Sequence, residues 1–221
     1  MEKKALRLNI DQIITSLAEV QVDFDKINNL LTMRREHLTD EIIQNLVAGY
    51  AYVDNLIARD VRIFPNNTEH LMEMNHIVLC GSDPKVRFEY STHLQETQKR
   101  FYTLIQPIKQ WYQKYHDSSS YRIASEIYVG VLSRPQLFIE GNHRTGSLIA
   151  TYFLLTRGKP PFVLNKNNAI AYFEPSTQIK LSDKTSIRGK FRLPKYEKAF
   201  KTFLKAHTRN QGCSYAFKSS D

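Results

Sequence analysis

The sequence predicts an all-α fold, mostly helical, with one short β-hairpin. Apolar residues recur with a helical period of 3.6 through most of the 221 residues. Polar stretches containing Gly or Pro separate these periodic segments, and the clearest period-two alternation covers Val86–Tyr90. Because 42% of the residues are hydrophobic and 11% are aromatic, the chain can bury a substantial core.

The first part of the chain is expected to form four helices and then a strand. Amphipathic spacing predicts helices over residues 10–17, 22–31, 42–57 and 69–79. Asp83-Pro84 then turns the chain, and Val86, Phe88 and Tyr90 alternate with charged residues. This alternation predicts a strand, which we place in a hairpin over residues 83–92.

The second part is expected to be helical as well, with breaks at Pro and Gly. Apolar residues predict helices over 101–115 and 123–132, and the dipeptide Arg134-Pro135 ends the second. Another helix is expected to begin near Asn142 and to end at Gly158. A last helix carries lysines opposite apolar residues, with residues 165–168 and 182–190 as polar connectors.

Positive charge is concentrated at the C-terminal end. The formal net charge is +9, and residues 180–221 hold 11 Lys and Arg against 3 Asp and Glu. Such a segment is either a solvated helix face or a surface for an anionic partner, such as nucleic acid, an anionic surface or an acidic protein. No apolar run suits a signal peptide or a membrane span, so we expect a cytoplasmic protein.

One loop between two predicted helices carries a pattern typical of phosphate binding. Residues 136–146 read QLFIEGNHRTG. At a helix start, backbone N–H groups lack partners, Gly141 lets a phosphate approach them, and Asn142 and Arg144 add donors. Glu140 is the one acid in this run and would suit Mg²⁺ beside a polyphosphate. The alternative is an ordinary helix cap in which Glu140 pairs with Arg144.

This loop resembles the active-site motif of Fic-domain proteins, His-Pro-Phe-x-Asp/Glu-Gly-Asn-Gly-Arg-x-x-Arg. Five positions are in register: Phe138, Glu140, Gly141, Asn142 and Arg144. The resemblance spans roughly residues 40–165. It divides the chain into an N-terminal helical segment (1–39), a Fic-like core (40–165) and a basic C-terminal extension (166–221).

The resemblance implies nucleotide binding and transfer to a protein. Glu140 would hold Mg²⁺, and the phosphates of ATP or a related nucleotide would be held by Gly141, Asn142, His143, Arg144 and Thr145. A protein target would dock along Val86–Tyr90. In Fic-like proteins a helix with a Thr and a Glu one turn apart often inhibits the site, and Thr15 and Glu19 are similar to that pattern.

Three departures from the motif put the transfer reaction in question. The catalytic His of the motif corresponds to Gln136, whose amide cannot take up a proton, and the last Arg corresponds to Ser147. A general base typically contributes about 10²- to 10⁴-fold to a rate, so AMP transfer should be slowed or absent. The second motif Gly is His143, a substitution similar to that of the Doc branch, which the resemblance associates with phosphate transfer.

His143 is the candidate substitute base, because Arg144 and a helix N-terminus disfavour its protonated form. Alternatively, His143 only donates a hydrogen bond or packs against the helix. The sequence therefore leaves three hypotheses open: a divergent AMP- or phosphate-transferase acting on a protein hydroxyl, a catalytically inactive Fic fold that serves as an interaction module, and a nucleic-acid binder that uses residues 180–209.

Overall fold

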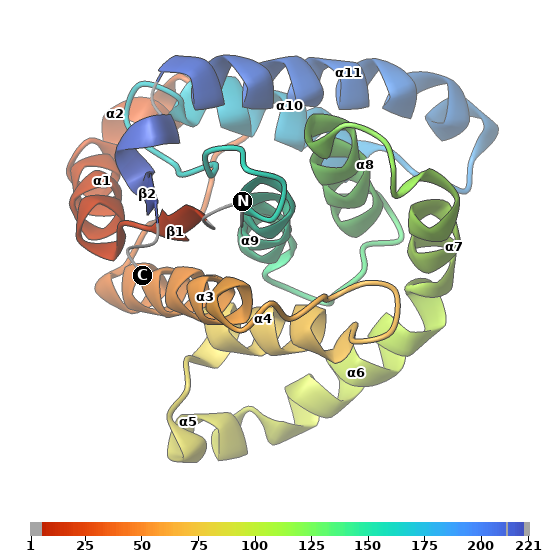
Figure 1. Cartoon of the computed structure of the whole chain (residues 1–221), viewed down its shortest axis with the longest axis horizontal. Helices are drawn as coiled ribbons and strands as arrows, with labels where there is room; N and C mark the ends of the chain where they lie inside the picture. The colour runs from red at the N-terminus through yellow and green to blue at the C-terminus, as the bar shows by residue number, and fades with distance from the viewer. Residues whose placement is uncertain (1–5, 211, 219–221) are drawn as a thin grey trace.

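The computed structural model describes residues 6–210 and 212–218, and this part of the chain is mostly helical, as predicted (Figure 1). Its α-helices are α1 (Ile10–Val22), α2 (Phe24–Asn29), α3 (Asp40–Ala58), α4 (Glu69–Cys80), α5 (Pro84–Glu89), α6 (Ser91–Leu104), α7 (Gln106–Tyr115), α8 (Ser120–Leu132), α9 (Asn142–Leu155), α10 (Ala169–Leu181) and α11 (Ile187–Asn210).

The two ends of the described chain meet in a small antiparallel sheet. Strand β1 (Leu6–Leu8) pairs with β2 (Ala216–Lys218), and Leu8 lies opposite Ala216. A short 3₁₀ helix, η1 (Gly212–Tyr215), precedes β2. The carboxylate of Asp54 in α3 accepts hydrogen bonds from the backbone N of Leu8 at 2.8 Å and from Arg7 Nε at 2.9 Å. These contacts tie the sheet to α3.

Helix α9 occupies the centre of the molecule (Figure 1). It packs against α8, α3 and α4, and most of its side chains are buried. The approach to α8 is close, since a Cβ added at Gly146 would lie 2.9 Å from Cδ2 of Tyr128. The centre of the fold therefore holds the first turn of α9, where the predicted phosphate loop ends.

The predicted hairpin over residues 83–92 is wrong, because this segment is helical. Oδ1 of Asp83 accepts a hydrogen bond from the backbone N of Lys85 at 2.8 Å, and Pro84 begins α5. A cap followed by Pro is a strong local helix start, and it overrides an alternation only five residues long. Phe88 is consequently 79% exposed, and a docking strand does not form at Val86–Tyr90.

Other element boundaries also differ from the prediction. The helix expected over residues 101–115 is divided into α6 and α7 at Ile105, because Pro107 lies in the first turn of α7 and lacks the N–H that a continuous helix needs. The connector expected over residues 182–190 ends early, since α11 begins at Ile187.

One hydrophobic core runs through the described chain. It includes residues from each of the segments 1–39, 40–165 and 166–221, from Leu8 to Tyr215. Division of the chain at those boundaries stays a prediction. Among the described helices, none is both long enough and apolar enough to cross a membrane.

Candidate functional site: a cation-lined cavity at the start of α9

The backbone conformation at position 141 and its close contact with α4 both require a glycine there. Gly141 is the N-cap of α9 and has φ 70° and ψ 6°, in the left-handed region. A Cβ at this position would lie 3.0 Å from Nδ2 of Asn75. That amide donates to the carbonyl of Glu140 at 2.9 Å and to Oγ1 of Thr145 at 3.0 Å. Asn75 therefore clamps the loop onto α4.

Asn142 and Thr145, both predicted to bind phosphate, use their side chains to hold the loop. Oδ1 of Asn142 accepts from the backbone N of Phe138, and Nδ2 donates to the Phe138 carbonyl, both at 2.9 Å. Oγ1 of Thr145 is engaged by Asn75, and its side chain is fully buried. The side chains of these two residues therefore hold the loop in shape.

A cavity of about 450 Å³ lies against the loop, within the range of about 300 to 1,000 Å³ usual for small-molecule sites. Its walls come from the connector between α2 and α3, from α3, from the start of α9 and from α10. Six of the predicted site residues line it: Gln136, Glu140, Gly141, Asn142, His143 and Arg144. Thr145 is not among its lining residues in the described chain.

Cationic side chains outnumber carboxylates in this cavity. Its lining includes Arg34, Arg35, Arg144 and Lys180, with Glu36 and Glu140 as the acids. Burial lowers the pKa of Arg35, Arg144 and Lys180 from their usual values. A desolvated cation is destabilised unless an anion compensates it, so the cavity favours a negatively charged ligand.

Arg35, from the connector before α3, is the most extensively bonded of these cations. Its Nη1 donates to Nε2 of His143 at 2.9 Å, and its Nη2 donates to the Phe173 carbonyl at 3.0 Å and to Oγ1 of Thr177 at 2.5 Å. The guanidinium also lies over the Phe173 ring, 5.2 Å from its centroid. Its Nε is buried without a hydrogen-bond partner among the described residues.

Sequence reasoning missed Arg35. The residue lies in a short polar connector, Arg34 to Asp40, that matches no motif. Its only local signal is the pair of adjacent arginines. Its place in the site depends on α10, which supplies Phe173 and Thr177.

His143 is neutral, and both of its ring nitrogens are engaged. A guanidinium can only donate, so Nε2 accepts the hydrogen bond from Arg35, and Nδ1 therefore carries the proton and donates to the Tyr128 hydroxyl at 3.2 Å. Burial, followed by the charges of Arg35, Lys180 and Arg144, holds the pKa of His143 well below its usual value. The lone pair that a general base would use is directed at Arg35.

Gln136 lines the cavity, but its amide is directed at the preceding helix. Its Nε2 donates to the Leu132 carbonyl at 3.1 Å, and its backbone carbonyl accepts from Arg100 Nε at 2.8 Å. The position where the Fic motif has its catalytic His therefore carries a group that fixes the loop.

Glu140 is exposed, and no ion pair joins it to Arg144 in the described structure; Arg144 Nη1 instead donates to the Val78 carbonyl at 2.8 Å. The cap with a Glu140–Arg144 pair, weighed as an alternative, is thus not observed. Glu140 and Glu36 both line the cavity, which suits Mg²⁺ bound by one or two carboxylates and phosphate oxygens. No cluster of three or more His, Cys, Asp or Glu suited to a metal occurs among the described residues, so the ligand would have to supply the remaining oxygens.

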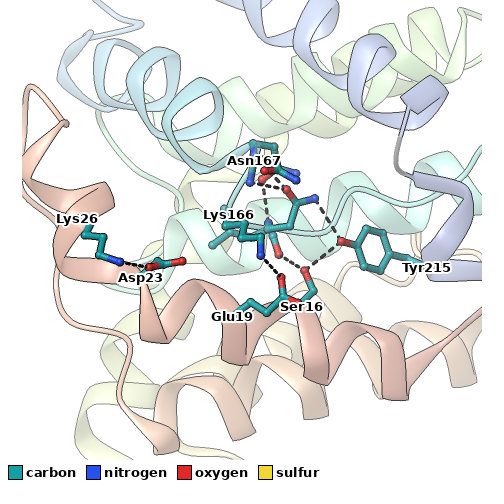
Figure 2. A network of polar contacts seen from close by, with 10 residues as sticks. Ser16, Glu19, Asp23, Lys26, Lys166, Asn167 and Tyr215 are labelled. Carbon is teal, nitrogen blue, oxygen red and sulfur yellow. Dashed lines mark hydrogen bonds and ion pairs between the residues drawn. The ribbon is translucent and has the colours of Figure 1, made fainter.

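Glu19, the candidate inhibitory residue, lies at a different place. Its Oε2 pairs with Lys166 Nζ at 3.4 Å on the surface, as Figure 2 shows. The neighbouring Ser16 donates to the Leu164 carbonyl at 2.9 Å, and Thr15 donates to the Asp11 carbonyl. Glu19 pairs with Lys166 in this structure, and the inhibitory role stays a prediction.

Comparison with known proteins adds no relative: no protein-family model, no curated protein and no solved structure matches this chain.

Proposed function

We propose that this protein is a Fic-like nucleotide-binding protein, which holds a phosphate-bearing ligand together with Mg²⁺ in the cavity at the start of α9. The observation that carries the proposal is the convergence of four cationic side chains on one cavity beside Gly141, three of them with a pKa lowered by burial. A phosphate would compensate these charges and accept hydrogen bonds from the guanidinium groups.

The cavity has a suitable place for each part of a nucleotide. The phosphates would bind Arg35, Arg144 and Lys180. Glu140 and Glu36 would bind Mg²⁺, and the metal ion would neutralise phosphate charge. Aromatic side chains supply the apolar wall that a base requires: Phe24, Phe162, Tyr172 and Phe173.

Transfer of AMP or phosphate would require a proton acceptor. The oxygen of a protein hydroxyl would attack a phosphorus of ATP, and the bond from that phosphorus to the leaving group would break, which releases pyrophosphate in AMP transfer and ADP in phosphate transfer. The hydroxyl proton would have to go to a base. Gln136 cannot accept it. Nε2 of His143 can accept it only when Arg35 releases that nitrogen, and a phosphate that attracts Arg35 would cause this release. The transferase hypothesis therefore depends on a ligand-induced shift of Arg35.

A second candidate is a module that binds nucleotide without transferring it. The arrangement that supports it is the engagement of Gln136 by Leu132 and of His143 by Arg35 and Tyr128. Binding and transfer can be separated experimentally.

Isothermal titration with ATP and Mg²⁺ tests the binding step. We expect Lys180→Gln and Arg144→Ala each to weaken binding by at least about tenfold, as loss of a charge-assisted hydrogen bond would. Arg192→Ala, which removes an exposed cation on α11, is the matched control and should bind as the wild type does. Circular dichroism verifies that each variant is folded. Absence of ATP binding by the folded wild type would refute the proposal.

Intact-mass analysis after incubation with ATP, Mg²⁺ and a lysate tests the transfer step. An added AMP or phosphate on any protein supports the transferase, and His143→Ala should then abolish the reaction. Unchanged turnover in His143→Ala would remove this residue from the mechanism. Binding without any mass change supports the non-transferring module.

A further inference from the structure

The beginning of α11 carries two large apolar side chains that point away from the core. Ile187 is 77% exposed and Phe191, one turn later, is 82% exposed. Leu181, the last residue of α10, is 47% exposed. Ile187 and Phe191, one turn apart on the outer side of α11, indicate a contact surface rather than packing.

The connector between α10 and α11 holds this part of the helix firmly. Arg134 N donates to the Ser182 carbonyl and Lys184 N donates to the Arg134 carbonyl, both at 2.8 Å, while Lys184 Nζ donates to the Gly130 carbonyl at 2.6 Å. Further along α11, Leu193 and Phe200 are buried. The rotation of the helix is thereby set, and Ile187 and Phe191 remain outside.

The same outward side of α11 is basic. Of the exposed cations in this helix, Arg188, Lys195 and Lys198 fall on the side of Ile187 and Phe191 at 100° per residue, and Lys190 and Arg192 lie on either flank of it. None of these five forms an ion pair with any residue that the structure describes. Glu197, the one acid in the sequence of α11, is engaged inside: its Oε1 accepts from Ser125 Oγ at 2.7 Å and lies 3.6 Å from Lys201 Nζ. In Figure 1, α11 runs along one edge of the molecule.

We propose that this basic face of α11, with Ile187 and Phe191 at its beginning, docks on an anionic lipid bilayer. The two apolar side chains would enter the headgroup region, and the cations around them would attract acidic lipids. A fluid bilayer accepts a protruding side chain without a complementary pocket, whereas a folded protein must offer one. Single-stranded nucleic acid offers stacking for Phe191, but Ile187 has no aromatic face to stack. The proposal is independent of what the cavity binds.

Flotation of the full chain with lipid vesicles tests this surface. We expect binding to phosphatidylcholine vesicles that contain about 30% phosphatidylserine, and at least about tenfold less binding to phosphatidylcholine alone. Raising the salt concentration from about 0.05 M to about 0.3 M should release most of the protein, because the attraction is screened.

Paired variants separate the contribution of Ile187 and Phe191 from non-specific hydrophobic adsorption to the vesicles. Ile187→Ser with Phe191→Ser should weaken vesicle binding by at least about tenfold, since two apolar side chains lose their burial in the bilayer. The matched control is Val22→Ser with Phe88→Ser, which removes a β-branched and an aromatic side chain that are 84% and 79% exposed elsewhere. This control should bind as the wild type does.

Three results would overturn the proposal. One is failure of the wild type to float with phosphatidylserine vesicles at low salt. Another is equal binding by the wild type and the Ile187→Ser, Phe191→Ser variant, which would leave only charge adsorption. The third is tight binding of an RNA or DNA oligonucleotide by the α11 face without vesicle binding, which would assign the surface to nucleic acid.

Discussion

Arg35 in the cavity and Lys198 on the outer face of α11 are both cations, but only Arg35 is held by the protein. Arg35 donates to two oxygen acceptors on α10 and to His143, and burial lowers its pKa. Lys198 is exposed and has no ion pair within the described structure. A partly buried, hydrogen-bonded cation can recognise the geometry of one ligand, whereas exposed cations attract any anionic surface and respond to salt.

The difference between these two cations should be largest in their contribution to the free energy of unfolding. Arg35→Met removes the hydrogen bonds donated to the Phe173 carbonyl, to Thr177 Oγ1 and to His143 Nε2. The Phe173 carbonyl still accepts from Thr177 Oγ1, so the two side-chain acceptors are the ones that lose their donor, at about 1 to 3 kcal/mol each. We expect a loss of about 4 kcal/mol in the free energy of unfolding, measured by urea denaturation at pH 7. Lys198→Met should leave the unfolding midpoint unchanged. Equal effects of the two substitutions would contradict the contrast.

The same contrast between buried and exposed groups predicts that two histidines differ in their effect on the pH dependence of stability. Burial lowers the pKa of His207 to about 4, and its Nδ1 contacts Asn168 Nδ2 at 2.9 Å. Because the folded pKa lies below the unfolded value, the unfolded chain takes up the proton first. This contribution to stability is therefore complete above about pH 6.5 and is lost as the pH falls towards 4, roughly 3 kcal/mol in total. In urea denaturation from pH 7 to 4, His207→Gln should reduce this pH dependence, and His37→Gln, at an exposed site, should retain it. A variant that keeps the full dependence would show that His207 is not its source.

A pair of glycines tests how tightly the cavity loop is packed. Gly141 and Gly158 have nearly the same positive φ, 70° and 67°, but a Cβ at Gly141 meets Asn75, Val78 and Leu79, whereas one at Gly158 meets nothing within 4 Å. Gly158→Ala should cost about 1 kcal/mol from backbone strain alone, and Gly141→Ala about 2 kcal/mol. Thermal unfolding of both variants measures the difference. Equal losses of stability in the two variants would mean that α4 shifts to accommodate the added methyl group at little cost in free energy.

The smallest effect on stability and on ATP affinity is expected when charges are removed from the α11 face. Lys195→Gln with Lys198→Gln should leave both the unfolding midpoint and ATP affinity unchanged, because neither lysine lines the cavity. The same variant should weaken vesicle binding by up to about 30-fold at low salt, since each exposed cation near an anionic bilayer contributes about 1 kcal/mol. A change in ATP affinity would show that the two basic regions are coupled.

Local rules accounted for most of the helices and for one side of the cavity. Capping and spacing located the start of α9. Glu140, Gly141 and Arg144, which the sequence assigns to one site, line the same cavity, and their role in binding stays a prediction. At residues 83–92 the period-two alternation predicts a strand, but the Asp83 cap and Pro84 begin a helix.

The sequence by itself determined the helical class, the basic C-terminal end and the loop at Gly141, because each depends on neighbouring residues and on backbone propensity. Only the tertiary structure decided that Arg35 reaches His143, 108 positions away, that Lys180 faces the same cavity, and that β1 pairs with β2. Helical periodicity shows which face of a helix is buried, but it does not show which faces meet.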